Sequence, residues 1–264
     1  MDNGYAMITG ATGGLGKAFA QILLRQGYSL LLTGRSEEKL CLLKEELQAK
    51  NEKADIRVYA ADLSNLDSRN ELFAKIGKEE MRISVLVNAA GADIQKEFRL
   101  YSQEKIAFQC RVNFEAAVSV CRFVLDNAEK DLRIVNVASV SGIYPMPYFA
   151  IYSASKKALT SFSLALREEV KSKGVKVTAV LPGAMPTRED IKAQIKGQGV
   201  WGKLAAKTPE WVAEYSLKAV ERNRWQVIPG FWNQCMRFFT AWLPLSWKLR
   251  FIAKRWSKIS KDAF

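Results

Sequence analysis

Short apolar segments alternate with longer amphipathic segments along most of the chain. Continuous apolar runs of strand length lie at 5–9, 29–34, 56–63, 83–91, 133–140, 175–183 and 225–230. Between them, apolar residues recur at helical spacing, for example at 15–26, at 36–50 and in a long segment around 104–128. Strands buried on both faces have such continuous apolar runs, and the helices between them cover the two faces of a parallel sheet. The pattern therefore predicts an α/β fold with a doubly wound parallel sheet.

The alternation predicts one domain over residues 1–230, because no linker-like stretch interrupts it. Residues 231–264 form a tail of different composition, with seven Lys or Arg residues against one acid. All seven tryptophans of the chain lie at or beyond Trp201. Cations and Pro244 interrupt the tail too often for a membrane-spanning helix, and Pro244 predicts a break between two short helices.

The second predicted tail helix is amphipathic. Its apolar stripe consists of Leu245, Leu249, Ile252, Trp256 and Ile259. The cations on the opposite side are Arg250, Lys254 and Lys258. This layout is typical of an interfacial helix on anionic lipid, although Trp247 and Phe251 fall outside the stripe. The alternative is a tail that packs on its own domain or on a second subunit.

Composition limits the chemistry. The net charge of +13 predicts an anionic partner, but no recognition motif accompanies it, so no nucleic acid partner is expected. The absence of histidine excludes His-based triads and His metal sites, and no metal is expected. The cysteines Cys41, Cys110, Cys121 and Cys235 show no paired spacing and are expected to be buried free thiols in a reducing compartment. The first residues lack a signal-peptide pattern, so a cytoplasmic protein is predicted. The tail adds the alternative of peripheral attachment at the inner membrane face.

A glycine-rich turn follows the first predicted strand. Gly10, Gly14 and Gly16 lie where the strand turns into a helix. Glycine there allows close approach to a ligand, and the helix N-terminus attracts a pyrophosphate. The turn therefore predicts dinucleotide binding. The second strand ends in Gly34 and Arg35, at the position where an NAD site usually has an acid. Arg35 therefore predicts a contact with the 2′-phosphate of NADP(H). The alternative is that Arg35 is an exposed loop arginine.

Tyr152 and Lys156 are spaced as neighbours on one face of a predicted helix. Many such pairs only cover surface. In a dinucleotide-binding domain, however, a lysine ammonium beside a phenol would stabilise the phenolate and bring the phenol pKa toward neutrality. Tyr152 is therefore a candidate general acid and base.

The combination of motifs resembles the short-chain dehydrogenase/reductase family. It consists of TGATGGLG at 9–16, NAAG at 88–91, Ser139 after the fifth strand, YSASK at 152–156 and PGAMPT at 182–187. The resemblance covers roughly residues 4 to 230 and implies a Rossmann-type fold. Two departures are Ala89, where the family often has a second Asn, and the longer cationic tail.

The resemblance implies a site residue by residue. The implied catalytic residues are Asn113, Ser139, Tyr152 and Lys156. The implied cofactor contacts are Gly10, Thr12, Gly13, Gly14, Leu15, Gly16, Arg35, Asp62, Leu63, Asn88, Ala90, Gly91, Tyr152, Lys156, Pro182, Gly183 and Thr187. Among these, the alternative for Asp62 is a helix cap. The family is usually dimeric or tetrameric, so a homodimer or homotetramer is expected.

The segment after Ser139 is apolar and aromatic. Its residues Ile143, Tyr144, Met146, Tyr148 and Phe149 would suit a lipophilic carbonyl such as a steroid or an acyl chain, or else they pack in the core. The sequence therefore predicts an NADP(H)-dependent oxidoreductase that interconverts a carbonyl and a secondary alcohol. The alternative is a protein with the same fold that binds a dinucleotide or scaffolds a membrane without turnover.

Overall fold

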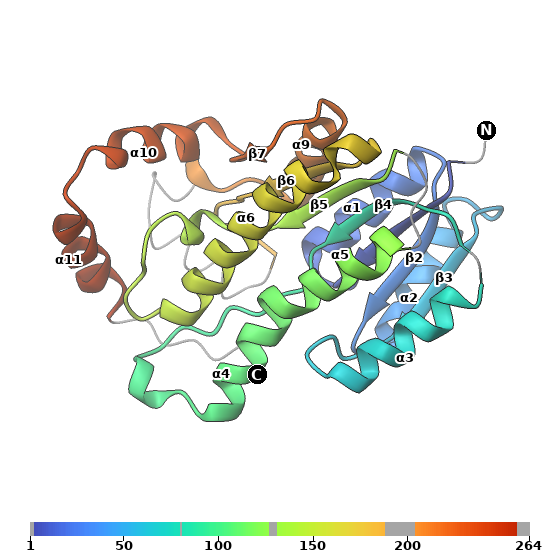
Figure 1. Ribbon diagram of the computed structural model, residues 1–264, viewed down its shortest axis with the longest axis horizontal. Helices are drawn as coiled ribbons and strands as arrows, with labels where there is room; N and C mark the ends of the chain where they lie inside the picture. Colours follow the sequence, from blue (N-terminus) through green and yellow to red (C-terminus); the bar gives the residue numbers. More distant parts are fainter. Residues whose placement is uncertain (1–2, 80, 127–130, 188–203, 258–264) are drawn as a thin grey trace.

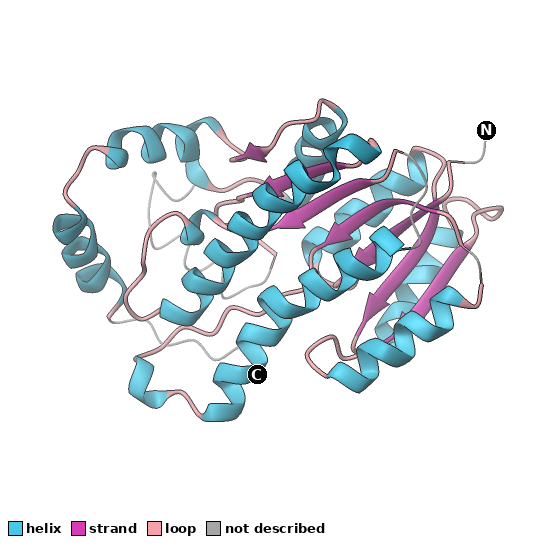
Figure 2. Cartoon of the chain, in the orientation of Figure 1, coloured by secondary structure: helices cyan, strands magenta, loops and turns pink. Residues whose placement is uncertain are grey.

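Seven parallel strands form one sheet in the order β3-β2-β1-β4-β5-β6-β7 (Figure 2). The strands are β1 (Tyr5–Thr9), β2 (Ser29–Gly34), β3 (Ile56–Ala60), β4 (Ile83–Asn88), β5 (Arg133–Val137), β6 (Lys176–Val180) and β7 (Gln226–Val227). The computed structural model describes residues 3–79, 81–126, 131–187 and 204–257. The sheet confirms the predicted Rossmann-type doubly wound fold, because the chain begins in the middle and winds outward in both directions.

Helices cover both faces of the sheet (Figure 1). The longer ones are α1 (Gly14–Arg25), α2 (Glu37–Gln48), α3 (Leu66–Gly77), α4 (Gln103–Cys110), α5 (Ala116–Asp126), α6 (Ala150–Val170), α9 (Pro209–Glu221), α10 (Phe231–Ala241) and α11 (Leu245–Trp256). Short turns are η1 (Phe98–Leu100), η2 (Arg111–Glu115), η3 (Val140–Gly142) and η4 (Lys171–Lys173). In the packed core, α1, α2 and α9 share one face, and α3, α5 and α6 share the other.

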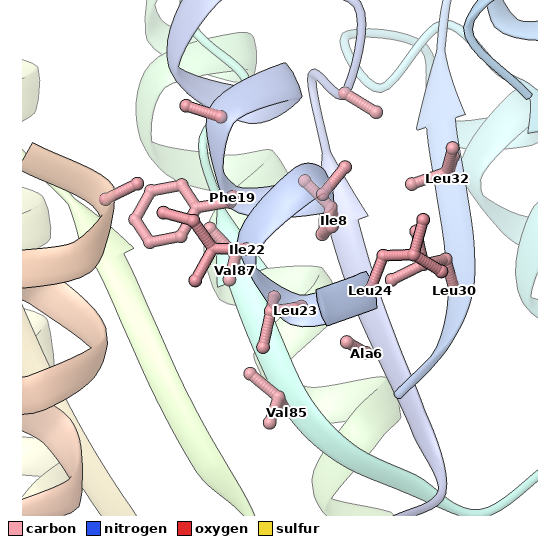
Figure 3. Close-up of a cluster of buried hydrophobic side chains, with 14 of the residues drawn as sticks. Ala6, Ile8, Phe19, Ile22, Leu23, Leu24, Leu30, Leu32, Val85 and Val87 are labelled. Atoms are coloured by element: carbon pink, nitrogen blue, oxygen red, sulfur yellow. The ribbon is translucent and has the colours of Figure 1, made fainter. Parts of the chain in front are cut away.

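The core consists of two apolar layers, one on each side of the sheet. Alternate strand residues point to opposite faces, so Ala6 and Ile8 join the layer of α1 whereas Met7 joins the layer of α5. Figure 3 shows Phe19 and Leu23 of α1 among the strand residues of the first layer. This double burial explains why the strands are continuous apolar runs in the sequence.

Side-chain caps fix the starts of several helices. The Ser36 side chain accepts a hydrogen bond from the main-chain N–H of Lys39 and caps α2. Asn65 caps α3 in the same way through the N–H of Ser68. The alternative of Asp62 as a helix cap is therefore wrong, because Asn65 lies closer to the first turn and occupies that position.

The long helix predicted around 104–128 is not continuous. A π-helical turn, η2, separates α4 from α5 and contains Asn113. Both amide atoms of Asn113 bond the main chain of Ala92, with its Oδ1 accepting at 2.8 Å and its Nδ2 donating at 2.9 Å. Such single-turn insertions often occur at functional sites.

The tail forms two helices on either side of Pro244, as predicted. Of the stripe expected to face lipid, Leu249, Ile252 and Trp256 are partly covered and Leu245 is exposed, while Trp247 and Phe251 outside the stripe are exposed. Ile259 and Lys258 lie outside the described residues. Within the described ranges, no helix is both long enough and apolar enough to cross a bilayer.

The four cysteines are free thiols, as expected, but only Cys121 is buried. Cys41 and Cys110 are exposed and Cys235 is partly covered, so the expectation that all four are buried is wrong. Cys41 and Cys110 lie on amphipathic helices, where a residue beside the apolar stripe can face solvent.

Candidate active site

The predicted glycine turn packs backbone against backbone at the carboxyl ends of β1 and β4. Gly10 has a φ of +65°, and a Cβ on it would lie 2.8 Å from the main-chain nitrogen of Ala90. A Cβ on Gly16 would lie 2.2 Å from the carbonyl oxygen of Gly10. Both positions therefore require glycine. The neighbouring strands β1 and β4 mark the point where the strand order reverses, which is where ligands bind in such sheets.

The N-terminus of α1 is suited to an anion. Gly13 occupies the N-cap without a side-chain hydrogen bond, and the first turn contains no acid. Thr12, Gly13 and Gly14 are exposed, whereas Leu15 is buried and anchors the turn. The free N–H groups and the helix dipole therefore fit the pyrophosphate of a dinucleotide.

A cavity of about 350 Å³ opens beside this turn, lined by Gly14, Thr187 and the start of α9 among others. Lys17 also lines it and pairs with Glu46 at 2.5 Å. A larger cavity of about 730 Å³ lies between α9, β7 and α10, and none of the four predicted catalytic residues lines it. The same four residues are absent from the lining of the smaller cavity, which instead includes Gly14 and Thr187 of the predicted cofactor contacts.

The NAAG segment is held by Thr9. The Thr9 hydroxyl accepts hydrogen bonds from the main-chain N–H groups of Ala89 and Ala90 at 3.1 and 3.2 Å. The Asn88 side chain is buried, and its Nδ2 donates to Oδ1 of Asn136 at 2.9 Å. The Oδ1 of Asn88 is buried without a hydrogen-bond partner among the described residues.

Arg35 is exposed just beyond the end of β2. Its guanidinium lies 5.7 Å from the ring centroid of Phe108, and it makes no ion pair with any residue that the structure describes. A guanidinium with free donors at this strand end fits a phosphate on the adenosine ribose.

The predicted adenine-side pair follows β3. Asp62 is exposed, and its Oδ1 accepts from the main chain and the hydroxyl of Ser64. Leu63 is buried, and its carbonyl accepts a 2.8 Å hydrogen bond from Arg69, which also pairs with Glu115 of η2. Arg69, which sequence reasoning missed, thus links this loop to the turn that holds Asn113.

Tyr152 and Lys156 lie one turn apart on α6, as the spacing predicted. The Lys156 nitrogen lies 5.8 Å from the Tyr152 ring centroid. The Phe149 ring stacks on the Tyr152 ring, with 4.3 Å between the two centroids. Lys156 is buried and donates a 2.9 Å hydrogen bond to the carbonyl of Val137. Burial lowers the pKa of Lys156 to about 8, while the charge of Asp93 acts in the opposite direction.

Asn113 and Lys156 converge on Gly91. A Cβ on Gly91 would lie 2.9 Å from Oδ1 of Asn113 and 3.3 Å from Nζ of Lys156. Gly91 itself is exposed, so the space next to it is open to a ligand. The structure thus brings together three of the predicted residues from separate elements.

Ser139 is buried at the carboxyl end of β5, and its Oγ accepts from the N–H of Ser141 at 3.1 Å. The hydroxyl proton is not used in that bond, so it can be donated to another oxygen. Pro182 lies next to this segment, because its carbonyl accepts from the N–H of Val140. Strands β5 and β6 are neighbours, which brings the two loops together.

The loop after β6 contacts two other parts of the site. A Cβ on Gly14 would lie 2.7 Å from Cγ2 of Thr187, so Thr187 packs on the glycine turn. A Cβ on Gly183 would lie 2.7 Å from Nδ2 of Asn233 on α10. Residues 188–203, which follow in sequence, lie outside the described part of the chain.

The aromatic segment after Ser139 divides between core and surface. Phe149 is buried and Ile143 packs against the core, while Tyr144, Met146 and Tyr148 are partly exposed. Tyr148 has a φ of +63°, an uncommon conformation for a bulky residue that costs about 1–3 kcal/mol and is frequent near active sites.

Sequence reasoning also missed Asp93 and Thr9. Asp93 affects Lys156 through space, and Thr9 orders the main chain of NAAG. The signal for Asp93 was an acid two residues beyond that motif. Among the residues whose placement is described, no group of His, Cys, Asp or Glu side chains could hold a metal ion.

Comparisons with known proteins agree with this geometry. The family model described as "short chain dehydrogenase" matches residues 4–196. The chain is 34% identical over 192 residues to very-long-chain 3-oxoacyl-CoA reductase-A of Danio rerio, covering 70% of this chain and 59% of the relative. It is 33% identical to 3-ketodihydrosphingosine reductase of Bacteroides thetaiotaomicron, covering 69% and 64%. The matched part is thus about three fifths of these relatives' length.

A solved 7beta-hydroxysteroid dehydrogenase has the same fold, with a TM-score of 0.84 and 23% identity over 95% of this chain and 96% of that one. At this identity the structural likeness shows the fold alone. The family model, however, covers more than half of the chain, and the relatives are reductases. The chain therefore belongs to the short-chain dehydrogenase family of oxidoreductases.

Proposed function

We propose that the protein is an NADP(H)-dependent oxidoreductase that interconverts a ketone and a secondary alcohol on a lipophilic substrate. The observation that supports this most is the convergence of Lys156 and Asn113 on Gly91, with Tyr152 one turn from Lys156 on α6. A surface-covering Tyr and Lys pair would not require a buried ammonium beside an open glycine.

When bound, the nicotinamide supplies or accepts the hydride. In the reductive direction, the hydroxyl of Tyr152 donates its proton to the carbonyl oxygen as that oxygen gains charge. The ammonium of Lys156 stabilises the phenolate that remains. Ser139 donates a hydrogen bond to the same substrate oxygen and orients it. Asn113, held on Ala92, supports a proton path through water toward Lys156.

The cofactor assignment rests on Arg35. An exposed guanidinium without an acidic partner in the described chain, at the end of the strand where an acid would select NAD, favours a 2′-phosphate. Two features support binding of the rest of the dinucleotide. The first turn of α1 has no side-chain cap, and the main chain from Thr12 to Gly14 is exposed.

The lipophilic substrate is supported by the partly exposed aromatic segment and by the relatives' names, which describe reductases of long-chain ketones. The rival function is dinucleotide binding without turnover. NADPH oxidation on a panel of long-chain and steroid ketones, with a short ketone for comparison, tests between them. Turnover of at least one ketone is expected, and NADPH binding without turnover on any ketone would favour the rival.

Two further features belong to the proposal. A homodimer or homotetramer, which the family resemblance implies, is checked by light scattering during size-exclusion chromatography. The proposed place of action is the cytoplasm, with peripheral attachment to a membrane through the tail helices.

A further inference from the structure

The tail surface, residues 231–257, leaves most of its apolar side chains uncovered. Ten of the 17 large hydrophobic side chains that are exposed in the described chain lie between Phe231 and Phe251. Neither α10 nor α11 contains a buried residue. Trp242 is 83% exposed and Phe251 73% exposed. Monomeric soluble proteins rarely leave so many large apolar groups in water unless another surface covers them.

The same surface is purely cationic. Its charged residues are Arg237, Lys248, Arg250, Lys254 and Arg255, and the segment contains no Asp or Glu. No ion pair within the described ranges involves any of the five. Uncompensated cations among exposed aromatic rings match an anionic surface with an apolar layer beneath it.

The tail surface lies beside the candidate active site. Figure 1 shows α10 and α11 on the side toward which the carboxyl ends of the strands point. Tyr144, from the loop after Ser139, shares a 3.0 Å hydrogen bond with the hydroxyl of Thr240 on α10, and Lys248 of α11 lies 4.3 Å from the Tyr144 ring centroid. Asn233 of α10 packs on Gly183 of the loop after β6.

We propose that the tail surface docks the protein on an anionic membrane leaflet, so that the lipophilic ketone passes from the bilayer into the site past Tyr144. The proposal rests on the proposed function for the nature of the substrate. The exposed rings enter the headgroup boundary, and the cations meet the negative lipid charge. On α11, Leu249, Ile252 and Trp256 are partly covered, so the exposed Trp247 and Phe251 are the rings that this helix presents to lipid.

Charge disfavours a second copy as the cover of this surface. In a two-fold dimer the same patch meets itself, so the five cations of one copy would face the five of the other with no acid between them. An anionic bilayer has the complementary charge.

Co-sedimentation of the full chain with vesicles tests the docking. The vesicles contain phosphatidylcholine alone or phosphatidylcholine with phosphatidylserine, each at low and high salt. We expect binding to the anionic vesicles at low salt and weaker but persistent binding at high salt, because salt screens charge and not apolar contact. No binding of the wild-type protein to anionic vesicles at low salt would overturn the proposal.

A charge-matched pair of variants identifies the surface. Arg250→Gln/Lys254→Gln/Arg255→Gln removes three tail cations, and Lys39→Gln/Lys53→Gln/Lys173→Gln removes three exposed lysines elsewhere. At roughly fivefold per cation near the membrane, the loss of three cations should weaken vesicle partitioning of the tail variant by roughly 100-fold, and that of the control far less. Equal losses would mean that net charge alone drives binding and would overturn the assignment. A change of oligomer size in the tail variant alone would assign the surface to a second copy instead.

Turnover separates this proposal from the proposed function. Anionic vesicles should raise turnover of a long-chain ketone embedded in them for the wild type but not for the tail variant, while both turn over a water-soluble ketone alike. If the tail variant fails to bind vesicles yet reduces the embedded ketone as fast as the wild type, delivery from the membrane is wrong. Turnover of the water-soluble ketone measures the oxidoreductase activity independently of the tail.

Discussion

The ammonium of Lys156 donates its 2.9 Å hydrogen bond to the main-chain carbonyl of Val137, at the end of β5, and is almost completely buried there. A main-chain carbonyl compensates only part of the lost hydration of a charge, so the neutral amine is favoured relative to water. The same ammonium is the group that stabilises a phenolate on Tyr152. The burial that positions Lys156 therefore brings its protonation into the physiological range.

The first prediction concerns pH. The ammonium is present below the Lys156 pKa of about 8 and is lost above it, so kcat/KM for NADPH, which reports on the free enzyme, should fall as the pH rises through about 8. Asp93 raises this pKa, so Asp93→Asn should move the fall to lower pH. Glu97→Gln, an exposed acid in the same loop, is the control and should leave the profile unchanged. Superimposed profiles for the two variants would contradict the role of Asp93.

The second prediction concerns stability without cofactor. The pKa of Lys156 is lowered from 10.5 to about 8 in the folded protein. The charged lysine therefore lowers the free energy of unfolding by its full amount below pH 8, and this destabilisation shrinks to nothing as the pH rises to about 10.5. Lys156→Met removes that cost of about 3 kcal/mol and loses one hydrogen bond of about 1 kcal/mol. The variant should thus gain about 2 kcal/mol in the free energy of unfolding near pH 7, measured by urea denaturation.

Near pH 10 most of this gain should disappear, because the wild-type lysine is then neutral in the folded protein. Lys157→Met, an exposed neighbour on α6, is the control and should change the unfolding free energy little at either pH. A Lys156→Met protein that is less stable than the wild type near pH 7 would contradict the account of its burial.

The third prediction concerns the choice of cofactor. Arg35→Ala should weaken NADPH binding by about 10–150-fold, equivalent to about 1.5–3 kcal/mol for a charge-assisted contact, and leave NADH binding nearly unchanged. Fluorescence titration with both cofactors measures this. Lys53→Ala, an exposed lysine before β3, is the control for general charge. Equal weakening of both cofactors would make Arg35 a structural residue.

The strands could be predicted because each is buried on both faces and is therefore an unbroken apolar run; β1 and β2 have the predicted bounds. The η2 turn could not, since no Gly or Pro marks it and the hydrogen bonds of Asn113 in this turn go to Ala92, 21 residues away in sequence. The effect of Asp93 on Lys156 is likewise a relationship through space.

The face of α11 that points outward could not be predicted from periodicity either. A helical pattern identifies an apolar stripe but not which of its residues become covered, and here Leu249 and Ile252 are partly covered while Trp247 is exposed. The glycine turn, in contrast, was predictable because Gly10 and Gly16 are sterically required. The role of each site residue stays a prediction until it is measured.

The central claim is that Tyr152 transfers the proton to the ketone in an NADPH-dependent reduction. The most direct measurement is turnover of Tyr152→Phe, beside the wild type, on a ketone that the wild type reduces. Phenylalanine preserves the ring that stacks on Phe149, so the fold and NADPH affinity should be retained, as circular dichroism and titration can verify. The account predicts a loss in kcat of at least about 10²–10⁴, the contribution of general acid catalysis. Turnover near the wild-type value in the folded, NADPH-binding variant would contradict it.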